Sequence, residues 1–195
     1  MHNEVTASPG RKRSEASRQA ILEATWEQLN TLGFQGMSIE GVAAQAGVGK
    51  ATIYRWWASK GVLAVDAFLA AINLTLAFPE TPFARRDIEQ QLDNLVRVYR
   101  GRAGALFGEM IGASQADAEM RAAFYTGYLK PRREAAKAAF RRGIELGQFR
   151  SGLDPEALVD SLYGPIIYRM LTGIFPLDAA FVEHTRRVVF DGITP

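Results

Sequence analysis

The spacing of Ala43 and Gly47 constrains the fold of this chain more than any other feature of its sequence. Two helices that cross at a steep angle need a small residue where they touch, and Ala43 provides one. Four residues later the chain must turn sharply with a positive φ, which Gly47 adopts at little cost because it has no Cβ. We therefore expect a helix over residues 39–46, a turn at Gly47 and a second helix over residues 50–57.

The apolar residues around this turn fall where the two helices would face a common core. They are Val42, Ala46, Val48, Ile53 and Trp56. Tryptophans on a short helix usually anchor it, so we expect at least one of Trp56 and Trp57 to be buried. The other positions of the second helix then point outward. This is the geometry of a helix-turn-helix, in which the second helix enters the major groove of DNA.

Helical signals dominate the rest of the chain, and no alternating strand pattern interrupts them. Ser38, Ser59, Asp154 and Asp178 are expected N-caps. The predicted fold is all-α, with an N-terminal three-helix domain that contains the helix-turn-helix and a larger helical C-terminal domain. The expected divisions are a flexible basic arm over 1–13, the helix-turn-helix domain over 14–59 and the larger domain over 60–195. The expected helices beyond the turn cover 59–76, 87–100, 103–113, 117–146 (with a break near Gly127 or Pro131), 154–172 and 178–190.

Composition excludes several classes of function. The chain has no cysteine, which rules out disulfides, cysteine-ligated metals and thiol catalysis and fits a reducing cytosol. We expect a cytoplasmic protein without a secretion signal and without a membrane partner, because no apolar run approaches about 20 residues. The net charge of +2 does not indicate nucleic-acid binding. The basic cluster at 11–13 is open to two interpretations, a solvated tail or a contact to DNA.

No catalytic constellation stands out. The acidic residues show no paired spacing, the two histidines form no metal pattern, and neither a phosphate-binding glycine loop nor a nucleophile elbow occurs. We therefore expect a protein that is not an enzyme and needs no cofactor or metal.

The outward residues near the turn carry chemistry suited to DNA. Thr52 and Tyr54 have hydroxyls that donate to phosphate oxygens, and Lys60 can neutralise a phosphate. Lys50 and Arg55 are long enough to reach base edges, where guanine N7 and O6 are the usual acceptors. These residues predict both a backbone contact and a means of reading sequence.

The segment MSIEGVAAQAGVGKATIYRWWASKGVLAVDAF, with the leader ILEATWEQLNTLGF, resembles the DNA-binding domain of the TetR family of transcriptional regulators. The resemblance runs from about Arg18 to Phe68, and its most specific part is the run from Gly47 to Trp57 followed by Ser59 and Lys60. The C-terminal stretch from Gly147 to Gly192 also resembles C-terminal domains of this family. Two residues depart from the family pattern: Gly61 replaces the usual acidic residue, and Gly41 lies inside a helix, at a cost of about 1 kcal/mol relative to alanine.

This resemblance implies a DNA-binding homodimer, most members being repressors that a small molecule releases from a near-palindromic operator. Their C-terminal domain binds the effector and dimerises, largely through the last two helices. The positions that match the family's phosphate contacts are Thr52, Tyr54 and Lys60. The positions that match its base contacts are Lys50, Ala51, Arg55 and Trp56.

Two further sets of residues are expected in the larger domain. Aromatic and methionine side chains there are candidates for a pocket that takes an apolar or aromatic effector, although each also fits plain packing. They are Tyr99, Phe107, Met110, Phe124, Tyr125, Tyr128, Tyr163 and Tyr168. Apolar stripes on the last two helices are wide enough for a four-helix dimer contact. They comprise Leu158, Leu162, Ile166, Leu177, Phe181 and Val188.

Two alternatives to a ligand-responsive repressor remain at this point. One is a DNA-binding dimer without an effector, whose C-terminal domain only dimerises. The other is an enzyme with a helical body, against which the missing catalytic constellation argues.

Overall fold

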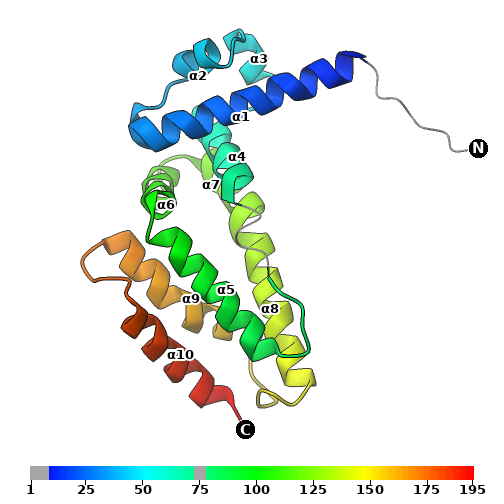
Figure 1. Ribbon diagram of the computed structural model, residues 1–195, viewed down its shortest axis with the longest axis vertical. Helices are drawn as coiled ribbons and strands as arrows, with labels where there is room; N and C mark the ends of the chain where they lie inside the picture. Colours follow the sequence, from blue (N-terminus) through cyan, green and yellow to red (C-terminus); the bar gives the residue numbers. More distant parts are fainter. Residues whose placement is uncertain (1–8, 73–77) are drawn as a thin grey trace, which may run out of the picture.

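The computed structural model describes residues 9–72 and 78–195, and this part of the chain is helical without any strand, as the sequence predicts (Figure 1). Helices of its N-terminal part are α1 (Pro9–Gly36), α2 (Ile39–Gln45), α3 (Lys50–Tyr54) and α4 (Lys60–Ile72). Later helices are α5 (Ala84–Tyr99), α6 (Arg102–Ser114), α7 (Ala118–Phe124), a π-helical turn (Tyr125–Leu129), α8 (Lys130–Glu145), α9 (Pro155–Thr172) and α10 (Ala179–Ile193). None of the described helices combines the length and apolar character that a membrane span requires.

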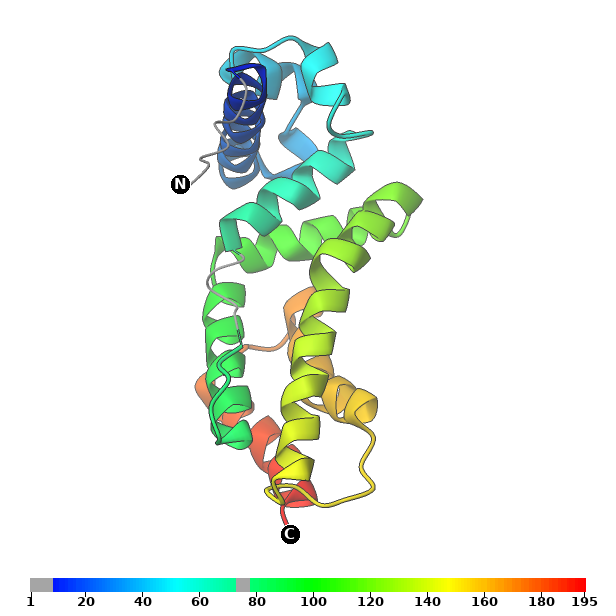
Figure 2. The same ribbon diagram turned by 90° about the vertical axis from the view of Figure 1, so that its right-hand side faces the viewer.

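The molecule is elongated, with α1, α2 and α3 at one end and the C-terminus at the other (Figures 1 and 2). Helix α4 runs between these two parts and packs on α1 on one side and on α6 and α7 on the other. Helices α5 and α8 extend side by side away from this junction, and α9 and α10 complete the far end.

The first helix begins earlier than predicted. Its backbone is helical from Pro9, so residues 9–13 are not the flexible arm expected from their charge, while residues 1–8 of that arm lie outside the described residues. Gly33 interrupts this helix with φ 74°, as expected of a helix-ending glycine. The amide of Phe34 then donates to Glu109 Oε2 at 2.8 Å, which anchors the interruption to α6.

The helix-turn-helix forms as its spacing predicts. The Ser38 hydroxyl caps α2 by accepting from the Gly41 amide, and Gly47 has φ 66°. The amide of Val48 donates back to the Ala43 carbonyl at 3.0 Å, so the chain reverses tightly where the small residue lies. Packing also explains why a glycine occupies position 41 inside α2, because a Cβ there would lie 2.7 Å from the Gln28 amide nitrogen.

The prediction for the two tryptophans at the end of this unit needs correction. Helix α3 ends at Tyr54 rather than at residue 57, and Trp56, expected in the core, is 40% exposed. Trp57 is the buried residue, and its indole nitrogen donates to Asp66 Oδ2 at 2.9 Å. The reason is that α4 offers an acceptor at the Trp57 position, which satisfies the polar edge of a buried indole.

Helix α4 lies in the core of the structure. Leu63, Ala64 and Phe68 are fully buried, and Phe68 meets Phe107 and Tyr128 of the larger part with ring centroids 6.3 and 6.1 Å away. Gly61 allows α7 to approach, since a Cβ there would lie 2.9 Å from the Met120 side chain. The glycine that departs from the family pattern is thus the residue that lets these two helices touch.

The long segment after residue 117 is not broken by a turn. It continues from α7 to α8 through the π-helical turn, which contains Gly127, one of the two predicted break points. A Cβ at Gly127 would lie 2.6 Å from Leu69 of α4, so the widened turn also relieves close packing. Farther on, Asp154 and Asp178 cap α9 and α10 as predicted, by accepting from the amides of Glu156 and Phe181.

Gly47→Ala should destabilise the protein by about 1–2 kcal/mol, because a Cβ at positive φ is strained even though open space surrounds it. Urea unfolding followed by circular dichroism measures the change. Gly108→Ala is the matched control, since it also meets open space but lies in an ordinary turn of α6, where alanine should stabilise by up to about 1 kcal/mol. Equal effects of the two substitutions would contradict a conformational role for Gly47.

Candidate nucleic-acid interface and ligand pocket

The outer surface of α3 presents the residues predicted to meet DNA. Lys50, Ala51 and Arg55 are exposed, and Thr52 is half-buried. Tyr54 is 53% exposed, a large fraction for an aromatic side chain. Trp56, just after the helix, is exposed as well, so most of these side chains are accessible to a partner.

Lys50 already has an acidic neighbour. Its ammonium lies 2.9 Å from Glu40 Oε1 on α2, and both side chains are more than half exposed. The hydrogen bond between them raises the pKa of Lys50 and lowers that of Glu40. Because water surrounds this pair, its attraction is weak, and a phosphate or a base edge can compete for Lys50.

Lys60 lies at the start of α4 and turns back toward the end of α1. Its ammonium donates to the Gln35 carbonyl at 3.1 Å and lies 4.8 Å from the centre of the Phe34 ring. Partial burial lowers its pKa. An ammonium has three donors, and the Gln35 carbonyl occupies one of them, which leaves two for an anion.

Asp66 joins three helical segments at the base of the interface. Its Oδ2 accepts from Arg18 of α1 at 2.8 Å and from the Trp57 indole at 2.9 Å. The Arg18 guanidinium also lies within 6 Å of the Trp56 and Trp57 ring centres. Asp66 therefore sets the position of the segment that follows α3 relative to α1 and α4.

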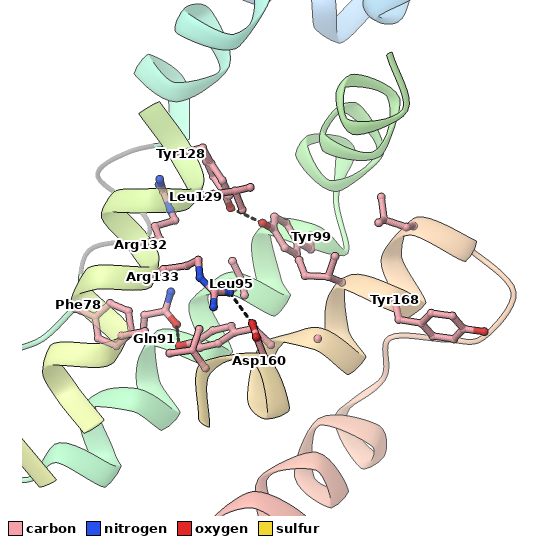
Figure 3. Close-up of a pocket in the computed structure, with 16 residues that line it drawn as sticks. Phe78, Gln91, Leu95, Tyr99, Tyr128, Leu129, Arg132, Arg133, Asp160 and Tyr168 are labelled. Carbon is pink, nitrogen blue, oxygen red and sulfur yellow. Dashed lines mark hydrogen bonds and ion pairs between the residues drawn. The ribbon is translucent and has the colours of Figure 1, made fainter. Parts of the chain in front are cut away.

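A pocket of about 450 Å³ opens among α5, α8 and α9 in the larger part (Figure 3). This volume falls in the range of small-molecule sites. Its walls are mostly apolar, with a few polar groups. The lining residues are Phe78, Gln91, Leu95, Tyr99, Tyr128, Leu129, Arg132, Arg133, Ala136, Val159, Asp160, Tyr163, Gly164, Ile167, Tyr168 and Leu171.

The polar groups of this pocket are paired in an ordered way. The Tyr163 hydroxyl donates to Gln91 Oε1 at 2.6 Å, and the Tyr99 and Tyr128 hydroxyls hydrogen-bond each other. Burial raises the pKa of all three tyrosines. These hydroxyls therefore stay protonated at neutral pH and act as hydrogen-bonding groups rather than charges.

The residues predicted for an effector pocket divide into two groups of four. Tyr99, Tyr128, Tyr163 and Tyr168 line the pocket. The others do not: Phe107, Met110 and Phe124 are buried in the core, and Tyr125 is 54% exposed. Phe124 stacks on Tyr128 and Phe107 meets it edge to face, so aromatic content alone did not separate pocket lining from core packing.

The sequence prediction missed the pocket residues that are not aromatic. Gln91, Leu95 and Tyr99 recur at intervals of four along α5, and Tyr128 and Arg132 do so across the π-helical turn and α8. Residues four apart lie on one face of a helix, so this spacing from a predicted pocket tyrosine could have identified them. No group of acidic or histidine side chains in the described part of the chain is arranged to hold a metal.

Most of the residues predicted for dimerisation are buried or partly buried in the core of the chain. Leu158, Leu162 and Ile166 are buried, because they form the face of α9 that packs on α8 and α10, and this corrects their assignment to an outer surface. Leu177 and Phe181 are partly buried against the same core, whereas Val188 is 79% exposed. The exposed residues of α9 include Ala157, Ser161 and Pro165, together with Gly164 and Tyr168, which border the pocket.

Comparison with known proteins assigns both parts of the chain. Residues 21–67 match the family model described as bacterial regulatory proteins of the tetR family, and residues 78–189 match the one described as a tetracyclin repressor-like C-terminal domain. The chain is 35% identical over 184 residues to the uncharacterized HTH-type transcriptional regulator YdeS of Bacillus subtilis, covering 94% of this chain and 93% of that protein.

Two more proteins show the same likeness. The chain is 27% identical over 173 residues to the DNA-binding transcriptional repressor TetR of Mycobacteroides abscessus, covering 87% of this chain and 90% of that protein. The crystal structure of the TetR family transcription regulator SCO0332 superposes with a TM-score of 0.80 at 39% identity, covering 92% of this chain and 99% of that one.

Asp66→Ala should destabilise the protein by about 1–2 kcal/mol, because it removes the acceptor shared by Arg18 and Trp57, a cost reduced by the partial exposure of the pair. Thermal or urea unfolding measures this loss. Glu23→Ala removes an exposed acceptor for Gln19 on α1 and should change stability by less than about 0.5 kcal/mol. A loss no larger than that of the control would mean that Asp66 does not tie the segments together.

Proposed function

The chain belongs to the TetR family of DNA-binding transcriptional regulators, and from this premise we propose that it is a homodimeric repressor that a small effector releases from a near-palindromic operator. The family is one of regulators rather than enzymes. The observation that carries the proposal is a single helix, α4. It contacts Trp57, just after α3, through Asp66, and it contacts Tyr128, in the wall of a pocket of ligand size, through Phe68. Such a regulator acts on chromosomal DNA, and we place it in the cytoplasm.

We assign the reading of DNA to the exposed face of α3. Thr52, Tyr54 and Lys60 hold phosphates, and Lys50, Ala51, Arg55 and Trp56 meet bases. Exposure of Tyr54, Arg55 and Trp56 supports contact of this surface with DNA, as does the weak pairing of Lys50, and the division into phosphate and base contacts follows the family pattern. Two such units in successive major grooves read half-sites about 34–36 Å apart.

Coupling between pocket and DNA passes through α4. Tyr128 lines the pocket on one side and packs against Phe68 of α4 on the other. Two residues earlier on the same helix, Asp66 holds Arg18 and Trp57. An effector that displaces Tyr128 therefore shifts the helix that positions the recognition unit. A preference of about 1–3 kcal/mol for the shifted state is enough for typical coupling.

A DNA-binding dimer without an effector is the second candidate. The pocket argues against it, because a domain that only dimerises has no need of a cavity of about 450 Å³ with paired polar groups. For the dimer we propose contact through the outer faces of α9 and α10, where Val188 and the small residues Ala157 and Ser161 allow close approach of helices.

Arg55→Ala and Lys60→Ala should weaken operator binding in different ways. The operator is first selected from random-sequence DNA by the purified protein. Lys60→Ala should lower affinity for all sequences and reduce the slope of log affinity against log salt by about 1, because one phosphate contact is lost. Arg55→Ala should relax preference at one base position, which a repeated selection measures.

Arg141→Ala serves as the control for both, because Arg141 is exposed on α8, far from α3. It should leave both the salt slope and the selected sequence unchanged. An unaltered slope in Lys60→Ala would remove Lys60 from phosphate binding, and an unaltered selected sequence in Arg55→Ala would remove Arg55 from base reading.

Val188→Arg should convert a dimer into a monomer and abolish tight operator binding, because it places a charge on the proposed contact face. Sedimentation at micromolar concentration measures the mass. Leu32→Arg changes an equally apolar, 58% exposed residue on α1 and should leave the dimer intact. A monomeric wild-type protein, or a dimeric Val188→Arg variant, would contradict the assigned interface.

A further inference from the structure

The pocket lining holds several hydrogen-bond donors and, on Arg132, a positive charge that no described acidic side chain pairs with, whereas its acid, Asp160, is paired with Arg133. We infer that its ligand is a small organic acid, in which a carboxylate bound by Arg132 is attached to an apolar or aromatic body. This inference deepens the proposed function, because it rests on the pocket being the effector site and names the chemical class of the effector.

The two arginines of the pocket differ in their partners. Arg133 is neutralised: it donates to Asp160 at 2.6 Å and also to Glu156 (Figure 3 shows the contact with Asp160). Glu156 is held as a carboxylate by Arg133 and Lys137, which lower its pKa to about 2. The acidic groups nearest the pocket are therefore already committed to Arg133 and Lys137.

Arg132 has no such partner. Its guanidinium lies over the Tyr128 ring at 4.1 Å, and among the described residues it makes neither an ion pair nor a hydrogen bond. Its Nε is buried and unbonded. Its two terminal nitrogens are unbonded as well but are not buried, so a ligand can reach them. A carboxylate matches the planar fork of arginine with two parallel hydrogen bonds. The ring of Tyr128 holds the guanidinium in place without neutralising it.

Other buried polar groups of the pocket lining also have hydrogen-bond donors to spare. Gln91 is 2% exposed, and its Oε1 is taken by the Tyr163 hydroxyl, which leaves the two N–H donors of its amide unused. Tyr99 and Tyr128 share one hydrogen bond between two hydroxyls, so one hydroxyl proton remains available. Asp160, the one acid in the lining, already accepts from Arg133.

Charge and polarity therefore select against other ligand classes. A cation would meet the positive charge of Arg132, and the charge of Asp160 is already offset by Arg133. A neutral hydrocarbon would fill the apolar walls formed by Leu95, Val159 and Ile167 but leave the donors unsatisfied. A carboxylate on an apolar body satisfies both parts of the pocket. The inferred ligand is thus amphipathic, which adds a charged head to the apolar effector expected from the sequence.

The test uses matched probes that share one body and differ in charge: 1-naphthoate, the neutral 1-naphthamide and the cationic 1-naphthylmethylamine. Binding is measured by calorimetry on the full-length protein, and release of the selected operator by fluorescence anisotropy. The acid should bind about 10- to 100-fold more tightly than the amide, the gain expected of a charge-assisted hydrogen bond, and the amine should bind least.

Substitutions of Arg132 then test whether this residue causes the preference for the acid over the amide. Arg132→Gln should bring the acid and the amide to similar affinities, and Arg132→Lys, which keeps the charge, should restore part of the preference. Arg141→Gln, an exposed arginine on the same helix, should behave as wild type. Thermal unfolding without ligand shows which variants are folded, and Arg132→Lys provides the comparison if Arg132→Gln is not.

Three outcomes would each overturn a different part of the proposals: the ligand class, the effector role of the pocket, or both. Equal affinities of acid and amide in the wild type, or an acid preference that survives in Arg132→Gln, would overturn the assignment of a carboxylate to Arg132. Tight acid binding without operator release would confirm the ligand class and overturn the effector role of the pocket. No binding by any of the probes would overturn both.

Discussion

Burial of α4 in the hydrophobic core, between α1 on one side and α6 and α7 on the other, is the constraint on which the other features depend. Leu63 and Ala64 are inaccessible to solvent, and Phe68 meets the aromatic cluster of the larger part. Gly61 and Gly127 remove the side chains that would otherwise hold α4 away from α7 and the π-helical turn. Because a close-packed helix cannot move without its neighbours, a change on either side of α4 is felt on the other.

The two functional regions use this helix through specific contacts rather than through general packing. On the DNA side, Asp66 accepts hydrogen bonds from α1 and from Trp57, which follows α3. On the pocket side, Tyr128 stands between Phe68 and the cavity, and Arg132 lies on the same ring. A carboxylate bound by Arg132 would therefore lie next to Tyr128, which contacts α4. Ligand binding and the position of the DNA-binding helices are thus separated by only a few contacts.

Local features of the fold were predictable because they depend on a few neighbouring residues. The caps at Ser38, Asp154 and Asp178 follow from a side-chain oxygen next to free amides, and the turn at Gly47 follows from a positive φ. The roles of the α3 residues in contacting DNA stay predictions, since they concern a partner. The choice of Trp57 over Trp56 as the core residue could not be predicted, because the acceptor on Asp66 lies nine residues away and faces it only after folding.

Spacing and residue chemistry within short segments thus specified the all-α fold, the recognition unit and membership of a regulator family. Which helix faces are buried depends on the packing of helices that are distant in sequence. Leu158, Leu162 and Ile166 are apolar enough for either a core or an interface, and the packing of α9 on α8 and α10 buries them in the core. The same holds for the pocket, since Tyr99 and Phe107 are equally aromatic but only one borders empty space. The sequence also could not show that Arg132 is unpaired. The fold brings Asp160 to Arg133 rather than to Arg132, so only the tertiary structure shows which arginine keeps a free charge.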